Sequence, residues 1–397
     1  MSNRAFVAGV GMTKFEKIET RDWEYTDMVK EAVTAALTDA GVEYDAVQRA
    51  AVGYVFGTST QGQRALYELG HTGIPVFNVN NNCATGSSAL FMAREWVEAG
   101  LVDVALAVGF EKMTKKALMG DGSMPKVTTV DGTLGVMVPT YGWGTGPMTA
   151  QFFGNAAREH MDRYGTTAEQ LAAVAVKNHQ HSTNNPYAQF QDAYTLEQVL
   201  SDKPVHEPLT RSQCSPTSDG AAAAVVVSER FAREHGLGGQ AVEIVGQAMA
   251  TDTAECFAGS MIDAVGAPMT RLAAGQLFGS TGRSIDEVDV IELHDCFSIN
   301  EIITYEGLGM CEPGQGGKLA ESGATTYGGQ WVVNPSGGLI SKGHPLGATG
   351  IAQVTELSWQ LRGLAGARQV EGASLALQHN LGLGGAVVMT LLQAPQG

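Results

Sequence analysis

Short runs of β-branched and small apolar residues alternate with amphipathic stretches of helical period along the whole chain. Residues 6–10, 50–56 and 103–109 are predicted strands, and residues 27–40 are a predicted helix. Residues 221–227 are continuously apolar, as expected for a strand that is buried on both faces of a sheet. This alternation predicts an α/β fold with a parallel sheet and helical crossovers.

The second half of the sequence repeats this order of elements. Residues 288–293 repeat the predicted strand at 50–56, and a further apolar run close to the C-terminus, 385–392, matches the run at 221–227. The tripeptide Ala-Thr-Gly precedes a predicted helix in each half, at residues 84–86 and 348–350. The chain is therefore predicted to contain two similar halves.

The number of residues between a segment of the first half and its match in the second half is smaller near the end of each half than near its start. The first half must therefore contain an insertion. We place it at about 112–209, the most irregular part of the sequence. This segment holds six of the fifteen methionines, which are soft enough to line an adaptable apolar pocket and equally suited to filling a core. The predicted domains are 1–237, which includes the insertion, and 238–397.

The chain of 397 residues has a formal net charge of -16 at pH 7. Such a charge repels polyanions, so we expect neither nucleic acid nor an anionic membrane surface as a partner. The segment from Lys112 to Arg211 is neutral, with nine Lys and Arg against nine Asp and Glu. This segment is our candidate for binding the phosphates of a ligand, and chance variation of surface charge is the alternative.

The number and spacing of the cysteines exclude two classes of site. The sequence has five of them, with no CxxC pair and no Cys/His spacing typical of a metal site, which argues against a disulfide framework and structural zinc. The N-terminus lacks the apolar core of a signal peptide, and no stretch approaches the roughly 18 apolar residues of a membrane helix. We expect a cytoplasmic protein without a metal site.

Cys83 lies in the segment Asn-Asn-Cys83-Ala-Thr-Gly-Ser, a turn that leads directly into an apolar-periodic helix. A thiol at a helix N-terminus lies near unpaired N–H groups, which we expect to lower its pKa toward neutrality. The small residues that follow leave room for a substrate. Cys83 is therefore a candidate nucleophile, and a buried inert thiol is the alternative.

His344 lies in a glycine-rich turn, Gly343-His344-Pro345-Leu-Gly. Gly343 frees the backbone before it and Pro345 fixes the chain after it, so the imidazole can be presented to a neighbouring group. Such a histidine suits the role of general base for a thiol. An ordinary surface histidine is the alternative.

Two further clusters follow predicted strands. The first is Glu-Leu-His294-Asp-Cys296-Phe, at the carboxyl end of a strand, where parallel-sheet enzymes place their chemistry. The second is Gln-His379-Asn380-Leu-Gly382-Leu-Gly-Gly, whose glycine amides could donate to a developing oxyanion. His379 and Cys296 have an equally plausible structural interpretation.

Together these clusters resemble the thiolase superfamily, and within it the sterol carrier protein X type of 3-ketoacyl-CoA thiolase. The resemblance extends from Gly9 to Leu392. It implies two βαβαβ halves in a five-layer αβαβα fold, an inserted loop domain, and a homodimer or tetramer. It also implies acyl-CoA and coenzyme A as substrates, with no bound cofactor or metal. Animal relatives carry a further sterol-carrier domain, which we do not expect in a sequence that ends at Gly397.

The resemblance implies a ping-pong thiolysis that belongs to β-oxidation-type lipid degradation. Cys83 would attack the ketone of a 3-ketoacyl-CoA, and His344 would accept the thiol proton. Most thiolases use a second, C-terminal cysteine as acid, and none occurs beyond Cys311 here. In the sterol carrier protein X type that role falls to Cys296, with His294 and His344 at the enolate oxygen.

The backbone N–H groups of Cys83 and Gly382 would form the other oxyanion site. Aligning the glycines places Asn380, not His379, where the missing cysteine would be, and both residues are predicted members of the site. Two alternatives stay open: an aldolase-like or condensing relative, and a non-catalytic acyl-CoA or lipid-binding protein of the same fold.

Overall fold

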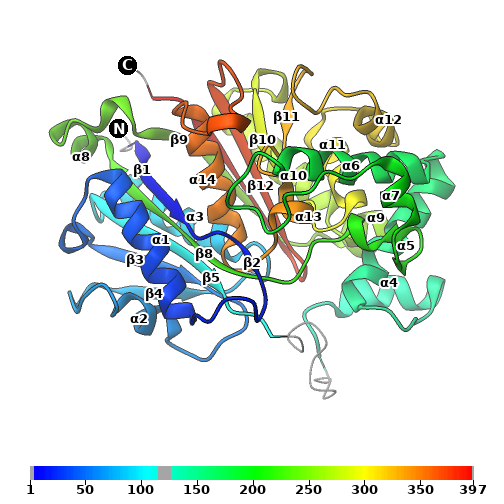
Figure 1. The fold of residues 1–397 in the computed structure, drawn as a ribbon, viewed down its shortest axis with the longest axis horizontal. Coiled ribbons are helices and arrows are strands. Elements are labelled where there is room, and N and C mark those ends of the chain that lie inside the picture. Colours follow the sequence, from blue (N-terminus) through cyan, green and yellow to red (C-terminus); the bar gives the residue numbers. More distant parts are fainter. Residues whose placement is uncertain (1–3, 115–126, 396–397) are drawn as a thin grey trace.

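The computed structural model describes residues 4–114 and 127–395 (Figure 1). Its core is a mixed sheet in which each half of the chain contributes five strands in one order. In the first half the order is β1 (Ala5–Met12), β8 (Ser218–Ser228), β5 (Val104–Glu111), β3 (Arg49–Gly53) and β4 (Val76–Val79). In the second half it is β9 (Val242–Ala250), β13 (Ala386–Gln393), β12 (Leu375–Gly382), β10 (Val290–Glu292) and β11 (Val332–Val333).

The strand directions also repeat. In each half the first two pairs are antiparallel and the next two are parallel, which gives β1–β8–β5–β3–β4 and β9–β13–β12–β10–β11 the same pattern. The halves join through β1 and β9, where Phe6 pairs with Glu243 and Val7 with Val242. The predicted α/β fold with two similar halves is confirmed. The predicted parallel sheet holds only for β5–β3–β4 and β12–β10–β11, because β1, β8, β9 and β13 pair antiparallel with their neighbours. The division at residues 237 and 238 stays a proposal.

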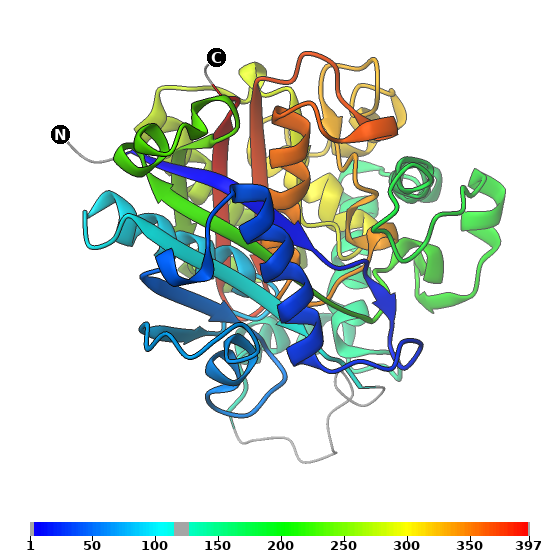
Figure 2. The same cartoon turned by 60° about the vertical axis from the view of Figure 1, so that its left-hand side comes forward.

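Two equivalent helices lie at the centre of the molecule (Figures 1 and 2). α3 (Thr85–Glu98) and α14 (Thr349–Leu361) pack on each other, and each contacts strands of both halves. α1 (Tyr25–Ala40) covers the outer face of the first half, and α10 (Ala267–Thr281) covers that of the second. Helix, sheet, helix pair, sheet and helix therefore form five layers.

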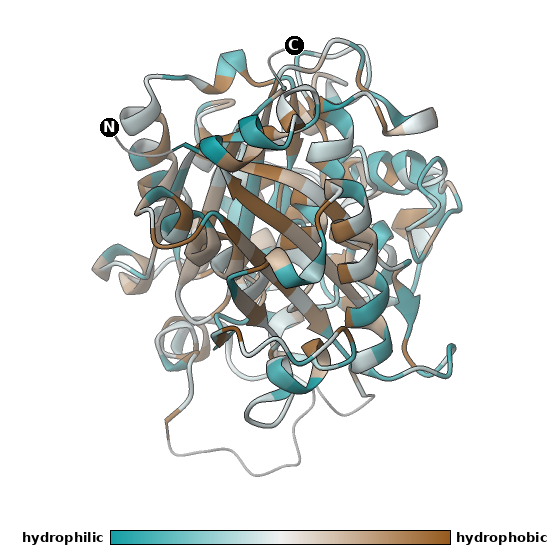
Figure 3. Cartoon of the chain, turned by 90° about the vertical axis from the view of Figure 1, so that its left-hand side faces the viewer, coloured by the Kyte–Doolittle hydropathy of each residue, from teal (hydrophilic) through white to brown (hydrophobic). Residues whose placement is uncertain are grey.

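The local structure follows the sequence pattern with one informative difference. β8 is buried along its whole length, as its continuous apolar run predicts, and the apolar strands are brown in the interior in Figure 3. The strand predicted at 50–56 ends at Gly53. It ends early because the backbone N–H groups of Val55 and Phe56 donate to the Glu111 carboxylate instead of to a neighbouring strand.

The helical excursion between β5 and β8 coincides with the predicted insertion, and residues 115–126 of that prediction lie outside the described residues. Its elements are α4 (Asp131–Tyr141), α5 (Met148–Tyr164), α6 (Ala168–Ser182), α7 (Leu196–Ser201), β6 (Pro204–His206) and β7 (Leu209–Thr210). Around the second half lie α11 (Ser298–Leu308), α12 (Gly316–Glu321) and α13 (Gly338–Lys342). The remaining elements are β2 (Glu16–Lys17), α2 (Gln61–Leu66), α8 (Glu229–Glu234) and α9 (Met261–Ala264). Within residues 4–114 and 127–395, no helix has the length and apolar character needed to cross a membrane.

Candidate active site

Four of the predicted catalytic side chains line one cavity of about 320 Å³. They come from three separate parts of the chain: Cys83 before α3, His294 and Cys296 after β10, and His344 before α14. The rest of the wall is mainly apolar and includes Met113, Val130, Met148, Phe152, Phe153, Phe297, Leu346 and Leu381. The fold thus brings these four residues together, although their catalytic roles remain predictions.

Cys83 lies in the turn that links β4 to α3, immediately before the helix, as predicted. The turn is fixed by the Thr85 hydroxyl, which accepts a hydrogen bond of 2.8 Å from the Asn81 N–H. Asn82 adopts a left-handed conformation with φ of 49°. Its side chain amide donates to the carbonyl of Leu383, so the turn is also tied to the second half.

The prediction that the helix N-terminus lowers the pKa of Cys83 is wrong. Burial raises the pKa of this thiol to about 12, and the nearby Glu111 carboxylate adds to the effect. Removing the sulfur from water disfavours the thiolate by more than the unpaired helix N–H groups favour it. Cys83 is therefore a neutral thiol at rest and needs a base at the moment of reaction.

His344 has the hydrogen-bonding state that such a base requires. Its Nδ1 lies 2.7 Å from the hydroxyl of Thr349, which in turn donates its hydrogen to the Pro345 carbonyl at 2.9 Å. Nδ1 must therefore carry the hydrogen, which leaves a lone pair on Nε2. Within the described part of the chain, the buried Nε2 has no hydrogen-bond partner, and burial lowers the pKa of His344 to about 3, with a contribution from Lys342.

The thiol and the two imidazoles lie close together. The sulfur of Cys83 and one ring nitrogen each from His294 and His344 lie within 4.8 Å of one another. The two rings meet edge to face, with centroids 5.1 Å apart and an interplanar angle of 86°. Proton transfer between Cys83 and a neutral imidazole requires only a small adjustment at this spacing.

Among the described residues, the trio of Cys83, His294 and His344 also gathers its donor atoms as metal ligands do. Both histidines are neutral, as a ligand must be, since burial lowers the pKa of each. The thiol, however, would have to lose a proton that burial strongly retains, because burial raises its pKa. That no metal acts here stays a prediction.

Cys296 lies in the same cavity, and burial, reinforced by Cys83, raises its pKa well above the usual range. A thiol of this kind keeps its hydrogen at neutral pH and can serve as a proton donor to a carbanion. The backbone of Cys296 is held by a hydrogen bond of 2.9 Å, which the N–H of Ser215 donates to the Cys296 carbonyl.

The structure separates His379 from the other predicted catalytic residues. It is buried on β12, where Nε2 bonds to the Thr270 hydroxyl at 3.1 Å and Nδ1 accepts from the His294 N–H at 3.4 Å. His379 is not among the residues that line the cavity. Both of its nitrogens are used within the protein, so its contact with the site is through the backbone of His294.

Gly382 and Asn380 do reach the site. A Cβ atom on Gly382 would lie 2.2 Å from the carbonyl oxygen of Asn81 and 3.0 Å from the nitrogen of Ala84, so only glycine fits beside the nucleophile turn. The side chain amide of Asn380 lies 3.0 Å from Nδ1 of His294. The oxyanion role of Gly382 stays a prediction.

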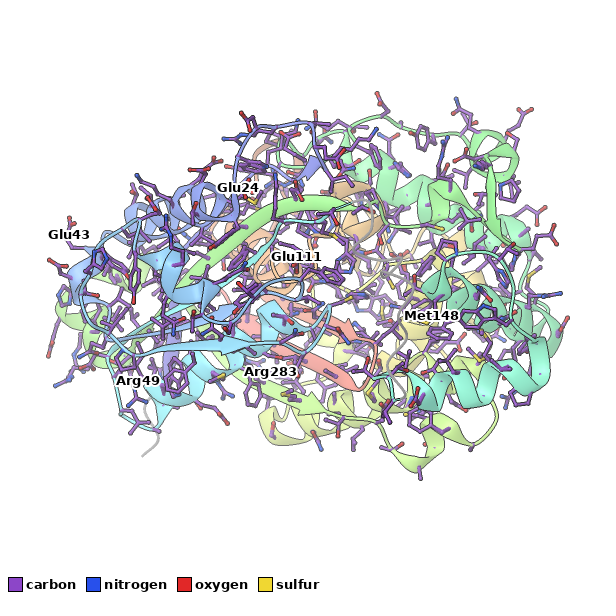
Figure 4. The ribbon with its side chains drawn as sticks, turned by 90° about the horizontal axis from the view of Figure 1, so that it is seen from below. Glu24, Glu43, Arg49, Glu111, Met148 and Arg283 are labelled. Carbon is purple, nitrogen blue, oxygen red and sulfur yellow. The ribbon has the colours of Figure 1, made fainter. Side chains whose placement is uncertain are left out.

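Glu111 is a functional candidate that the sequence analysis missed. It ends β5 at the centre of the molecule, whereas Met148 begins α5 on the side of the insertion (Figure 4). Its carboxylate accepts hydrogen bonds from the N–H groups of Val55, Phe56 and Gly347 at 2.9–3.1 Å, and burial raises its pKa to about 7. A carboxylate at the end of a buried strand is the sequence signal that could have identified it.

A second cavity, of about 660 Å³, adjoins the first, and residues 215–217 line both. Seven of its wall residues come from the neutral segment 112–211: His179, Gln189, Phe190, Tyr194, Gln198, Asp202 and Arg211. Lys17 adds a further cation to the wall. This outer cavity is large enough to hold a bulky polar group whose tail reaches Cys83.

Lys112 departs from the expectation for the segment that it begins. It lines neither the outer cavity nor the inner one, whereas Arg211, at the other end of the segment, is in the outer wall. The Nζ of Lys112 donates to the carbonyl of Trp23 at 2.7 Å and pairs with the Asp219 carboxylate at 3.5 Å. The part of the candidate phosphate-binding segment Lys112 to Arg211 that lines the outer cavity lies from His179 onward, and Arg211 there pairs with Asp202 at 2.9 Å.

A duplicated α/β fold and a cysteine–histidine site between its halves define the class of this protein. Residues 5–230 match the thiolase N-terminal domain, and residues 250–393 match the thiolase C-terminal domain-like family. The chain therefore belongs to the thiolase superfamily, as its motifs predicted.

Two curated relatives are similar over almost the whole chain. Sterol carrier protein 2 of Bos taurus is 56% identical over 393 residues, which cover 98% of this chain and 72% of the relative. Non-specific lipid-transfer protein-like 2 of Caenorhabditis elegans is 51% identical over 393 residues, which cover 98% of this chain and 95% of the relative. The predicted sterol carrier protein type of thiolase is thus confirmed.

Solved structures show the same fold. The Ltp2-ChsH2(DUF35) aldolase superposes with a TM-score of 0.83 at 25% identity, covering 99% of this chain and 98% of the other. Human mitochondrial 3-ketoacyl-CoA thiolase in complex with CoA superposes with a TM-score of 0.73 at 18% identity, again covering 99% and 98%.

Proposed function

We propose that this thiolase-superfamily protein cleaves 3-ketoacyl-CoA thioesters with coenzyme A, through a covalent acyl group on Cys83. The observation that carries the proposal is the grouping of the half-buried Cys83 thiol with the Nε2 lone pair of His344 in one cavity. The site supplies a nucleophile, a base and a separate acid thiol, which are the groups that ping-pong thiolysis needs.

The first half-reaction transfers the shortened acyl group to the enzyme. His344 Nε2 takes the proton of Cys83 as the sulfur attacks the ketone carbon, and the bond between C2 and C3 of the substrate then breaks. The electron pair of that bond becomes the enolate of the departing thioester, whose oxygen lies toward His294 and His344. Cys296 protonates C2, and acetyl-CoA leaves, or propionyl-CoA when the substrate carries a 2-methyl group.

The second half-reaction returns the acyl group to coenzyme A. The Cys296 thiolate takes the proton of the incoming CoA thiol, and the CoA sulfur attacks the acyl carbonyl. Collapse of the tetrahedral intermediate expels the Cys83 thiolate, which recovers its proton from His344. The N–H groups of Cys83 and Gly382 are the proposed donors to that intermediate.

The two cavities support coenzyme A as the second substrate. The outer cavity carries Lys17 and Arg211, of which Arg211 pairs with Asp202 in the same wall, and it meets the inner cavity at residues 215–217. We assign the nucleotide and its phosphates to the outer cavity and the reacting thioester to the inner one. The apolar wall of the inner cavity suits a fatty or sterol-derived acyl group.

A second candidate reaction is a retro-aldol cleavage, favoured by the similarity to the Ltp2-ChsH2(DUF35) aldolase. A retro-aldol reaction breaks a carbon–carbon bond without an acyl-enzyme, so it requires neither CoA as acceptor nor a nucleophilic thiol. Cys83 is retained here beside a base, which supports thiolysis.

Thiolysis is tested with a panel of 3-ketoacyl-CoA substrates of different chain lengths, including a 2-methyl-branched member. We expect CoA-dependent cleavage that falls to background in Cys83→Ala, because Cys83 is the thiol grouped with His344. Cys311→Ala is the matched control, since Cys311 lies outside the lining of the cavity. Cleavage that persists in Cys83→Ala, or that does not depend on CoA, would replace thiolysis with the retro-aldol reaction.

We further propose that the chain acts as a homodimer or tetramer in the cytoplasm, in degradative lipid metabolism. The edge strand β4 supports the proposed association of subunits, because it forms one edge of the sheet and leaves 42% of Phe77 exposed. Analytical ultracentrifugation measures the oligomeric state directly.

A further inference from the structure

Four buried polar side chains connect the nucleophile helix to His294. They form a continuous hydrogen-bonded chain, which we call the amide relay, and its members are Gln353, Gln378, Ser87 and Asn380. Gln353 lies on α14, Ser87 on α3, and Gln378 and Asn380 on β12, so the relay joins both central helices to the sheet. All four side chains are fully buried, so a lost hydrogen bond in the relay would leave a polar group unpaired at a high cost in free energy.

The direction of the relay is set at one end by a backbone carbonyl, which can only accept. The amide nitrogen of Gln353 donates to the carbonyl of His379 at 3.1 Å, so the oxygen of Gln353 must face the other way. That oxygen accepts a hydrogen bond of 2.9 Å from the amide nitrogen of Gln378. The orientation of both glutamines follows from this one anchor.

The same direction continues through the hydroxyl of Ser87. The amide nitrogen of Gln378 donates to this hydroxyl at 2.7 Å, and the hydroxyl donates to the side chain oxygen of Asn380 at 2.8 Å. If the Asn380 amide were turned over, the Ser87 hydroxyl would face two donors and have no acceptor. Asn380 therefore presents its NH2 group to Nδ1 of His294, at 3.0 Å.

The space around the relay is closed. A Cβ atom on Gly350 would lie 2.1 Å from the Ser87 hydroxyl oxygen and 2.5 Å from the side chain oxygen of Asn380. A larger residue at position 350 would therefore displace the relay. The packing leaves the Asn380 amide in one orientation.

We propose that the amide relay is a positioning device that fixes the tautomer of His294. Because Nδ1 accepts from Asn380, the ring hydrogen of the neutral imidazole must lie on Nε2. His344 is held in the opposite tautomer by Thr349, so one histidine offers an N–H donor and the other a lone pair. Burial lowers the pKa of both rings, which keeps them neutral and makes the tautomers distinct.

The two fixed tautomers give the two histidines different roles, an inference that rests on the proposed thiolysis. His344 accepts the Cys83 proton, while Nε2–H of His294 is ready beforehand to donate to the enolate oxygen. Two histidines with the same tautomer would supply either two bases or two donors. Among the described residues, the members of the relay are not part of the wall of the inner cavity, so we expect them to act on the reaction through His294.

The tautomers can be measured without turnover. In protein labelled with nitrogen-15 at histidine, long-range proton–nitrogen NMR distinguishes a ring nitrogen that carries hydrogen from one that does not. We expect His294 to carry hydrogen on Nε2 and His344 on Nδ1, with signals assigned from His294→Ala and His344→Ala spectra. Hydrogen on Nδ1 of His294 in the unmodified protein would overturn the proposal, whether or not thiolysis is observed.

Asn380→Asp reverses a single hydrogen bond with almost no change of shape. The carboxylate can still accept a hydrogen bond from Ser87. Because a carboxylate cannot donate, the hydrogen bond to His294 then requires a hydrogen on Nδ1. We expect the His294 signal to change to the Nδ1–H or the doubly protonated form. We also expect kcat for thiolysis to fall by on the order of 100-fold, the usual effect of losing one oxyanion donor, with KM much less affected.

Two further variants separate the relay from a general loss of stability. Gln247→Glu makes the same amide-to-carboxylate change at a half-buried hydrogen bond to Thr390, between β9 and β13, and should leave the His294 tautomer and kcat unchanged. Ser87→Ala breaks the relay without adding charge, and should give a mixture of His294 tautomers. An Asn380→Asp protein with the original tautomer, or with the original kcat, would refute the positioning role.

Discussion

Mild acid should unfold this protein, because several histidines are buried in their neutral form. Burial lowers the pKa of His179 to about 4 and that of His181, His344 and His379 to about 3. It also lowers the pKa of His294 well below its usual value. In the unfolded chain these side chains titrate near about 6.5. As the pH falls below that value, the unfolded state binds protons that the folded state does not, so stability is lost.

The magnitude follows from the number of protons involved. Each such histidine contributes about 1.4 kcal/mol of lost stability per pH unit between the two pKa values. Buried carboxyl groups act in the opposite direction, because burial raises the pKa of Glu111 to about 7 and that of Asp295 well above its usual range. With five histidines against two or three carboxyls, the net uptake on unfolding is about two to three protons, or roughly 3–4 kcal/mol per pH unit.

That slope is large compared with a total stability of about 5–15 kcal/mol. We expect the urea midpoint, followed by far-UV circular dichroism, to fall steeply between pH 6.5 and 5. His379→Gln should reduce the slope by about 1.4 kcal/mol per pH unit, and His235→Gln, at an exposed position, is the control. A free energy of unfolding that stays constant or rises from pH 6.5 to 5 would refute the assignment of these histidines as buried and neutral.

Two further outcomes test the site. In Cys296→Ala, acylation of Cys83 by a simple acyl-CoA should persist, while thiolysis of a 3-ketoacyl-CoA should slow by about 100-fold or more, since only the latter needs an acid for the enolate; equal loss in both stopped-flow assays would contradict the assignment. In Arg211→Ala, KM for CoA should rise about three- to tenfold with kcat unchanged, because an exposed phosphate contact contributes about 1 kcal/mol; an unchanged KM would move the nucleotide elsewhere. The exposed Arg233→Ala, at a distant cavity, is the control for Arg211→Ala.

Much of the fold could be predicted from the sequence because its signals are local or periodic. The apolar run of β8 and the repeated Ala-Thr-Gly tripeptide indicate the strand and helix order of both halves, and small residues mark the helix start after Cys83. These features depend on each segment alone. The four cavity residues were found because motif residues follow strand ends or precede helices.

What the sequence could not predict depends on contacts between distant segments. The pKa of Cys83 is raised by desolvation and by Glu111, neither of which is visible in the turn itself. His379 stands in a motif beside Asn380, yet neighbouring residues on a strand point to opposite faces, so the side chain of Asn380 bonds to the ring of His294 whereas that of His379 meets only its backbone N–H. Charge counting likewise could not show that Lys112 is held by Asp219, a residue more than a hundred positions away. The direction of the amide relay requires the relative placement of α3, α14 and β12.

The equivalence of α3 and α14 has a consequence for how this chemistry could arise. Cys83 immediately precedes one of these helices and His344 closely precedes the other, so the proposed nucleophile and its proposed base occupy corresponding places in the two copies of a duplicated unit. Neither copy alone contains both groups. An ancestor made of a single unit could have supported this reaction only by pairing with a second one, and the fused chain makes that association permanent.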